Sequence, residues 1–173
     1  VTVIATDEFD QFMAKNNLWN IALKESDNNK LLNYFLDAKL NKKLIRNIKD
    51  LIKNINYPIA IRSSSLSEDS QYQSLSGMYS TFMLPNNSKS LEERVGQVCE
   101  AIKRIYASTF FVEPKSLIDK ISQRMEEEKM AIIIMEMIGQ EHNNRFYPTF
   151  SGVAQSYNYY PTSYVKRKDG VAY

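Results

Sequence analysis

The sequence predicts an α+β fold, in which a mainly helical lead, residues 1–56, precedes a mixed sheet with packed helices, residues 57–173. Two observations predict it. Apolar residues recur at helical spacing between residues 6 and 55. Short β-type runs then surround a glycine turn, and a β-branched run, residues 130–138, follows two further amphipathic segments. We expect all 173 residues to belong to one domain.

The lead should open with a short strand at residues 1–5, followed by a helix with polar residues at both ends. Thr6 or Asp7 is expected to cap the start of this helix, because both side chains accept hydrogen bonds from free backbone N–H groups. The helix should end near the Asn16–Asn17 pair.

After a short helix around residues 19–23, two more helices complete the lead, the first of them capped by Ser26 or Asp27 and the second spanning residues 40–55. The second helix has a basic outer face, which consists of Lys42, Lys43, Arg46, Lys49 and Lys53. Such a face could bind nucleic acid, but a lysine-rich helix face is most often only solvated, and no aromatic residues interleave with it. We expect no nucleic-acid partner, and keep a nucleic-acid-binding module as an alternative.

Composition narrows the class of protein. A net charge of +2 is too small to indicate nucleic acid or an anionic membrane as the partner. Cys99 is the only cysteine, and no Cys/His cluster has metal-ligand spacing, so we predict neither a disulfide nor a metal site. No apolar run approaches the ~18 residues of a membrane span. We expect a cytoplasmic protein without a membrane partner, in which the only histidine, His142, is exposed rather than catalytic.

The central stretch of the sequence joins an apolar strand to a group of hydroxyl side chains. The strand, residues 58–61, should end at Arg62, whose guanidinium could bind phosphate or carboxylate oxygens through paired hydrogen bonds. Ser63 and the two serines after it add hydroxyls and backbone N–H groups. Gly77 permits a positive φ and a close backbone approach to a ligand before a second strand at residues 79–82. This pattern predicts a phosphate-binding edge.

Arg62 has a second interpretation, because Glu68 and Asp69 follow it closely and could form a structural salt bridge with it. The clustered donors favour a ligand over the salt bridge. Neither G-x-x-x-x-G-K-[ST] nor G-x-G-x-x-G occurs, so the pattern by itself does not specify a known phosphate loop.

The remaining elements before residue 139 should be two helices and the central strand of the sheet. Ser90 is the expected cap of a helix over residues 91–106, in which Cys99 is a packed thiol rather than a nucleophile. A further helix should span residues 114–128. Residues 130–138 should form a central strand, with Glu136 as its one charged residue.

The end of the chain is expected to contain paired strands. Residues 145–150 and 152–158 should form a hairpin or two adjoining strands, with Pro148 on an edge. Met135 and Met137 could border an adenine pocket or equally be core residues. The tyrosines of this region could stack on a base, but half-buried sheet positions are the more ordinary interpretation; they are Tyr157, Tyr159, Tyr160 and Tyr164.

Several motifs follow one another along the chain: residues 61–64 (IRSS), 68–69 (ED), 77–82 (GMYSTF), 106–110 (YASTF), 132–138 (IIIMEMI) and 151–153 (SGV). Together and in this order they resemble the nucleotide-binding domain of the phosphoenolpyruvate synthase and pyruvate phosphate dikinase family, which has an ATP-grasp-type fold. The resemblance spans most of the chain. It implies a partial ATP-grasp-like domain with a largely antiparallel sheet.

The resemblance implies an enzyme that binds ATP between two lobes, transfers a phosphoryl group to a histidine on another domain and passes it to pyruvate. Arg62 would be catalytic through its contact with the phosphates, residues 77–81 would lie along them, and residues 136–138 would meet adenine mostly through backbone. The implied cofactor-binding residues are Arg62, Ser63, Gly77, Met78, Ser80, Thr81, Glu136, Met137 and Ile138. ATP and Mg²⁺ are the implied cofactors.

The resemblance also implies that part of the machinery lies outside this chain. The family's lysine is expected upstream of Val1, and its Mg²⁺-binding acids downstream of Tyr173, so the fragment alone should be inactive. Within the match, the chain departs from better-known members at Ser70 and Gln71, and at Met135, where glutamine is common. The alternative is a non-catalytic nucleotide-sensing or interaction module on the same fold.

Overall fold

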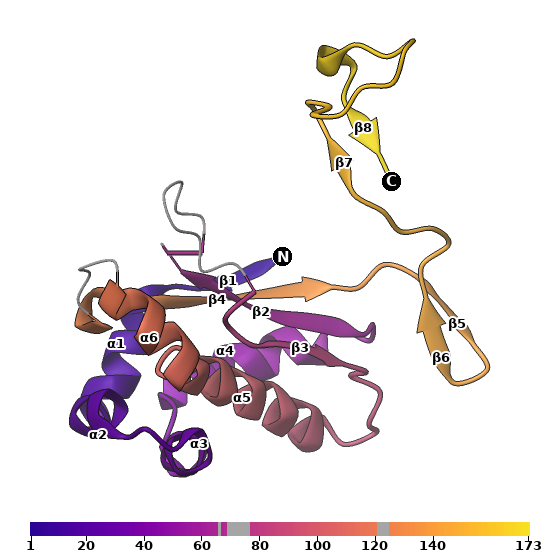
Figure 1. The fold of residues 1–173 in the computed structure, drawn as a ribbon. Helices are drawn as coiled ribbons and strands as arrows, with labels where there is room; N and C mark the ends of the chain where they lie inside the picture. The colour runs from indigo at the N-terminus through magenta and orange to yellow at the C-terminus, as the bar shows by residue number, and fades with distance from the viewer. Residues whose placement is uncertain (66, 69–76, 121–124) are drawn as a thin grey trace. The chain divides into compact units, whose positions relative to one another are not determined.

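The computed structural model describes residues 1–65, 67–68, 77–120 and 125–173 (Figure 1). The chain divides into two compact units, Val1–Met137 and Ile138–Tyr173. Each unit has its own strand pairing, and each is described by itself below.

The first unit is built on a four-stranded antiparallel sheet in the order β1-β4-β2-β3. Its strands are β1 (Thr2–Ile4), β2 (Ile59–Ser65), β3 (Thr81–Leu84) and β4 (Met130–Glu136). The β-branched run therefore forms a central strand, as predicted, although β4 ends at Glu136. The antiparallel sheet with its helices confirms the predicted α+β, ATP-grasp-like class.

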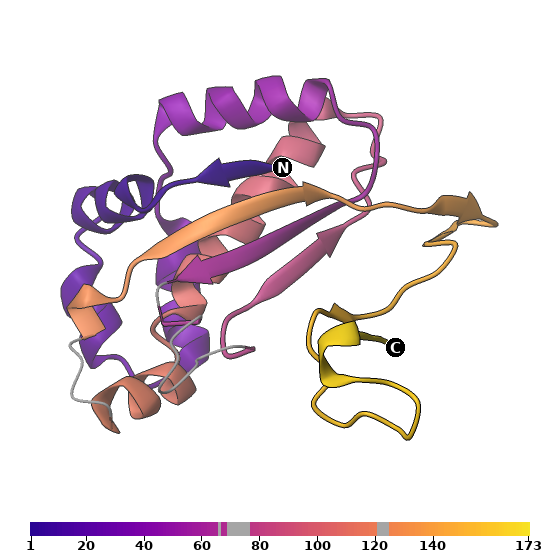
Figure 2. The same cartoon turned by 90° about the horizontal axis from the view of Figure 1, so that it is seen from above.

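Helices of the first unit lie on one face of this sheet, as Figures 1 and 2 show. α1 packs on β4, and α5 packs on both β2 and β3. The helices are α1 (Thr6–Lys15), α2 (Trp19–Lys24), α3 (Asn28–Asp37), α4 (Lys42–Lys53), α5 (Leu91–Ser108), α6 (Val112–Lys120) and the 3₁₀ turn η1 (Met125–Glu127). The helix predicted over residues 114–128 is thus α6 and η1, and residues 121–124 of that prediction lie outside the described residues.

Side-chain capping explains the starts of α3, α4 and α5. The Asp27 side chain accepts hydrogen bonds from the backbone N–H groups of Asn29 and Lys30, and Ser90 accepts one from Glu93, which confirms both predicted caps. The cap predicted for α1 is wrong: the N-cap is Ala5, and no side chain caps this helix, because Thr6 already has helical backbone. The end of α1 is confirmed, since Asn16 is its C-cap and Asn17 follows with a φ of 52°.

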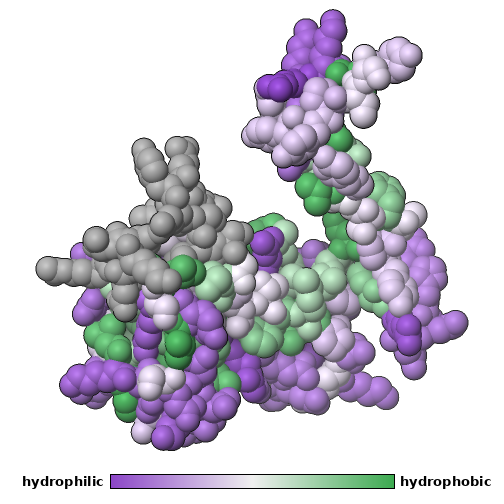
Figure 3. All heavy atoms as spheres, in the orientation of Figure 1, coloured by the Kyte–Doolittle hydropathy of each residue, from purple (hydrophilic) through white to green (hydrophobic). Residues whose placement is uncertain are grey.

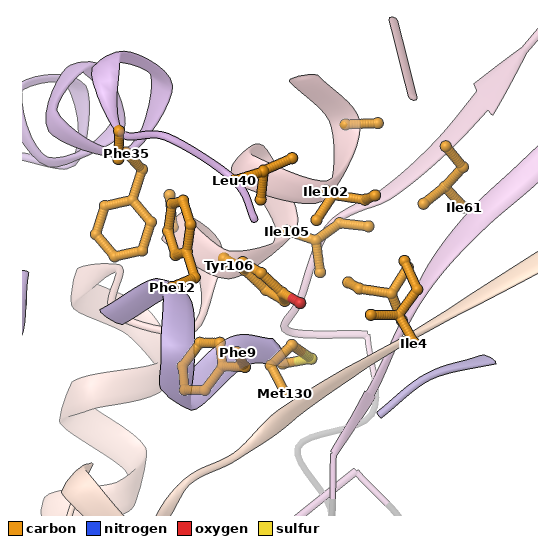
Figure 4. Close-up of a cluster of buried hydrophobic side chains, with 14 of the residues drawn as sticks. Ile4, Phe9, Phe12, Phe35, Leu40, Ile61, Ile102, Ile105, Tyr106 and Met130 are labelled. Atoms are coloured by element: carbon orange, nitrogen blue, oxygen red, sulfur yellow. The ribbon is translucent and has the colours of Figure 1, made fainter. Parts of the chain in front are cut away.

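The core lies between the helices and the sheet and is rich in aromatic rings (Figure 4). Phe9 is fully buried, and its ring centroid lies 5.0 Å from that of Tyr106 and 6.1 Å from that of Phe110. Phe12 and Phe35 extend the cluster, and their ring centroids lie 5.9 Å apart. Strand residues such as Ile61 close the core from the sheet side.

Hydrophilic residues cover most of the helical surface of this unit, whereas apolar residues are visible over the region of β2 and β3 (Figure 3). The basic residues on the outer face of α4 are exposed, and Lys49 forms a surface ion pair with Glu92 at 3.0 Å. None of the helices in the described part of the chain is long and apolar enough to cross a bilayer.

The second unit consists of two small antiparallel pairs. β5 (Gln140–His142) pairs with β6 (Arg145–Tyr147), and β7 (Ala154–Gln155) pairs with β8 (Val171–Ala172) across the 3₁₀ turn η2 (Arg167–Asp169). The expected pairing of residues 145–150 with 152–158 is therefore wrong. Asn143 and Asn144 both have positive φ, which forms a two-residue hairpin turn that returns the chain onto residues 140–142 instead.

Candidate functional site

Arg62 lies in the middle of β2, not at its end, which corrects the sequence expectation. The strand continues to Ser65, because Ser63, Ser64 and Ser65 remain paired with β4. Arg62 itself stands between Thr81 of β3 and Ile133 of β4. Its side chain is exposed, whereas Ile61 and Ser63 on either side are buried. Since side chains alternate along a strand, Arg62 projects from the face opposite the helices, which we call the open face.

Apart from Arg62, the open face is largely apolar. One row across the sheet contains Val3, Ile133, Arg62 and Thr81, as the strand register shows. The next row contains Met135, Ala60 and Met83. Val3 is 60% exposed and Met83 is 62% exposed. Among the residues of the four described strands, Arg62 is the only ionisable side chain that the alternation places on this face.

Ser63 points to the other face of the sheet. Its hydroxyl donates to Oε1 of Glu68 at 2.9 Å, and Oε2 of Glu68 accepts from the backbone N–H of Ser65 at 3.0 Å. Glu68 therefore binds the serines at the end of β2. No ion pair between Arg62 and another described residue is present, and Asp69, the other acid proposed for it, lies outside the described residues.

The segment from Gly77 to Thr81 brings a second polar residue to Arg62. Gly77 has a φ of 80°, which confirms the predicted positive φ. Met78 is half-buried against the core, and the backbone N–H of Ser80 donates to Oγ of Ser108 at 3.1 Å. Thr81, the first residue of β3, is exposed beside Arg62. Of the predicted site residues, the structure thus places Thr81 directly next to Arg62 on the open face.

A buried carboxylate supports the start of this segment. Glu128 is fully buried and accepts hydrogen bonds from the hydroxyls of Tyr79, at 2.8 Å, and Ser67, at 2.6 Å. Burial, together with the charge of Glu128, raises the pKa of Tyr79, so its hydroxyl remains a donor over the whole ordinary pH range. The sequence analysis did not single out Glu128 or its hydrogen bonds with Tyr79 and Ser67. Only the position of Glu128 next to a buried strand could have distinguished it from the two preceding glutamates.

The predicted adenine contacts lie where β4 ends. Glu136 is exposed and pairs with Ile59, while the backbone N–H of Met137 donates to the carbonyl of Pro58 at 2.8 Å. The boundary between the two compact units falls between Met137 and Ile138, and the side chain of Ile138 is 90% exposed. The three predicted adenine contacts therefore lie on both sides of the boundary between the two units of the chain.

Other candidate groups show ordinary environments. Cys99 is half-buried, and burial raises the pKa of its thiol, which disfavours the reactive thiolate. His142 is exposed in β5 opposite Arg145. The part of the chain that the structure describes contains no group of three or more His, Cys, Asp or Glu residues that could hold a metal ion. The four tyrosines are exposed, from 42% for Tyr157 to 98% for Tyr164, so their predicted half-buried sheet positions are wrong.

The fold is of the mixed α/β, partial ATP-grasp-like class, in which helices cover one face of the sheet and the other face displays Arg62. The family model of the pyruvate phosphate dikinase AMP/ATP-binding domain matches residues 2–171. The chain belongs to this family. None of the curated proteins compared with the chain matches it significantly.

Proposed function

We propose that the chain forms one wall of the ATP site of a phosphoenolpyruvate synthase-like phosphotransferase, with the nucleotide on the open face of the sheet. The observation that supports this most directly is Arg62, an exposed cation in the middle of a largely apolar face. An exposed arginine stays solvated at little cost in free energy. Its guanidinium can form strong paired hydrogen bonds with phosphate oxygens. Apolar neighbours reduce the local dielectric and strengthen that interaction.

In this proposal the phosphates lie beside Arg62 and Thr81, with the backbone of Gly77, Met78 and Ser80 leading toward them. Thr81 contributes a hydroxyl donor, and Arg62 neutralises phosphate charge, which is its catalytic role. Ser63 contributes through its backbone, since its hydroxyl is bound to Glu68.

The adenine ring would meet residues 136–138 mostly through backbone groups. The neighbouring apolar side chains of Ala60 and Met135, which the register places side by side on the open face, suit a flat ring. Glu136, Met137 and Ile138 would then supply the backbone contacts to the adenine ring.

Phosphoryl transfer needs more than the described residues offer. Mg²⁺ normally neutralises the phosphates in such reactions, but the described residues contain no carboxylate cluster that fits it. We therefore assign nucleotide binding to this chain, and the transfer through a histidine to pyruvate to other parts of a longer protein. The chain alone is expected to bind ATP without turnover.

The test is the affinity of the chain for ATP before and after Arg62→Ala. Loss of a charge-assisted hydrogen bond should weaken binding by about 1–3 kcal/mol, measured by isothermal titration calorimetry. Arg46→Ala is the matched control, because Arg46 is an exposed arginine on the helical side of the same unit. It should leave the ATP affinity unchanged. Equal ATP affinity for Arg62→Ala and the unmodified chain would contradict the role of Arg62.

Met135 favours a second candidate, a nucleotide sensor that has kept the fold without turnover. Its apolar side chain stands on the open face where the resembled enzymes commonly have a glutamine, so one polar contact to the nucleotide is replaced by an apolar one. A longer gene product that binds ATP yet forms no AMP, with or without pyruvate, would support the sensor over the phosphotransferase.

A further inference from the structure

Glu128 is a fully buried acid with no part in the proposed ATP contacts. It lies between η1 and β4, on the helical side of the first unit. Burial of a carboxylate is costly unless hydrogen bonds replace the lost water, so a buried acid with good partners has a defined structural consequence.

Both partners of Glu128 lie far from it in the sequence. Ser67 follows β2 directly, 61 residues before Glu128, and its hydroxyl reaches Oε2. Tyr79 precedes β3, 49 residues before Glu128, and its hydroxyl reaches Oε1. One carboxylate therefore joins both ends of the connection between β2 and β3 to the start of β4.

A second anchor holds the same segment from the other side. Oγ of Ser108, the last residue of α5, accepts from the backbone N–H of Ser80 and donates to the carbonyl of Ile105 at 2.7 Å. Because the Ser108 hydroxyl is 1% exposed and has both a donor and an acceptor partner, its orientation is determined. Tyr79 and Ser80 are thus each fixed by a buried side chain.

These anchors matter because β3 is an edge strand that has only β2 as a neighbour in the described sheet. Strand ends with one neighbour open locally at low free-energy cost. Thr81, the first residue of β3, lies immediately after the two anchored residues and beside Arg62. The position of Thr81 relative to Arg62 therefore depends on how firmly Tyr79 and Ser80 are held.

We propose that Glu128 is a positioning residue of the nucleotide site: by binding Ser67 and Tyr79 it holds residues 77–81 against the sheet and keeps Thr81 in register with Arg62. This inference rests on the proposed function, since it assigns the held segment to the ATP phosphates. Glu128 does not touch the nucleotide. Its contribution is to order a phosphate-binding segment before ATP arrives.

The experiment compares Glu128→Gln and Tyr79→Phe with Tyr106→Phe in the whole chain. Glutamine keeps the size of the side chain but has only one acceptor oxygen for two hydroxyl donors. Tyr79→Phe removes one of those donors. Tyr106→Phe is the control, because the Tyr106 hydroxyl is equally buried but has no hydrogen-bond partner among the described residues.

Two readouts separate positioning from general stability. Amide hydrogen exchange should become at least ~5-fold faster at residues 77–81 in both test variants and stay unchanged there in Tyr106→Phe. Affinity for ATP should fall by about 3- to 12-fold in the test variants, the size of effect that loss of one ordinary hydrogen bond produces. Adenosine, which has no phosphates, should bind all variants with equal affinity.

Each failure has a distinct meaning. Unchanged exchange at residues 77–81 in Glu128→Gln would overturn the anchoring role, whatever the ATP result. Faster exchange with unchanged ATP affinity would overturn the link to the phosphates. Absence of ATP binding by the unmodified chain would contradict the proposed function, and with it the nucleotide part of this inference, while the exchange result would still decide the anchoring.

Discussion

The two faces of the four-stranded sheet have similar sequence chemistry but opposite surroundings. On the helical face, Ile61 and Ile132 contact a core of aromatic rings and are fully buried. On the open face, Val3 and Met83 stay more than half exposed around a single arginine. The helical face stabilises the fold by removing apolar area from water, whereas the open face leaves apolar area exposed, as the proposed nucleotide site requires. We therefore expect mutations on the two faces to separate stability from binding.

The largest expected effect is on the helical face, at the aromatic cluster. Phe9→Ala should lower the free energy of unfolding by about 3–5 kcal/mol, because it removes a fully buried ring and leaves a cavity. Phe9 contacts the rings of Trp19, Tyr106 and Phe110, which are held by three different helices or turns and cannot all collapse into the space. Urea unfolding followed by circular dichroism measures this loss of stability. A loss below about 1 kcal/mol would show that this cluster does not dominate the core.

Adjacent residues of β3 sharpen the comparison, because they project to opposite faces of one strand. Phe82 is half-buried against the core, and Phe82→Ala should lower the free energy of unfolding by about 2 kcal/mol. Met83 is 62% exposed on the open face, and Met83→Ala should change it by less than about 0.5 kcal/mol. Denaturant titration of both variants tests the prediction. Equal losses of stability would mean that the open face is packed in solution.

A smaller effect than that of Phe9→Ala is expected at alkaline pH, and it again concerns the helical side. Burial raises the pKa values of both Tyr79 and Tyr106. The unfolded chain loses these protons near pH 10, while the folded chain keeps them, so stability is fully present below about pH 10 and falls as the pH rises further. Thermal unfolding between pH 8 and 11 measures the decline. It should be less steep in Tyr79→Phe and Tyr106→Phe, and an unchanged decline would contradict burial of these hydroxyls.

Local signals predicted much of this fold. The caps at Asp27 and Ser90, the positive φ of Gly77 and the helix that follows Ser90 depend on residues within a few positions of one another, and the structure confirms them. Strand ends and pairings were less predictable. A local two-asparagine turn redirected β6 onto β5, and continued pairing with β4 extended β2 beyond Arg62.

In the candidate site, too, some features could be predicted from local sequence and others depended on tertiary contacts. The sequence by itself predicted a phosphate-binding edge with Arg62 and Gly77, because residue type and order already express that chemistry, whereas Thr81 was implied only by the family resemblance. Only the tertiary structure decided that Arg62 is the ionisable side chain that the described strands place on the open face, and that Glu128, among three consecutive glutamates, is the buried one. The physical reason is distance along the chain. A helix cap is satisfied within three residues, whereas the partners that allow Glu128 to be buried lie 49 and 61 residues away.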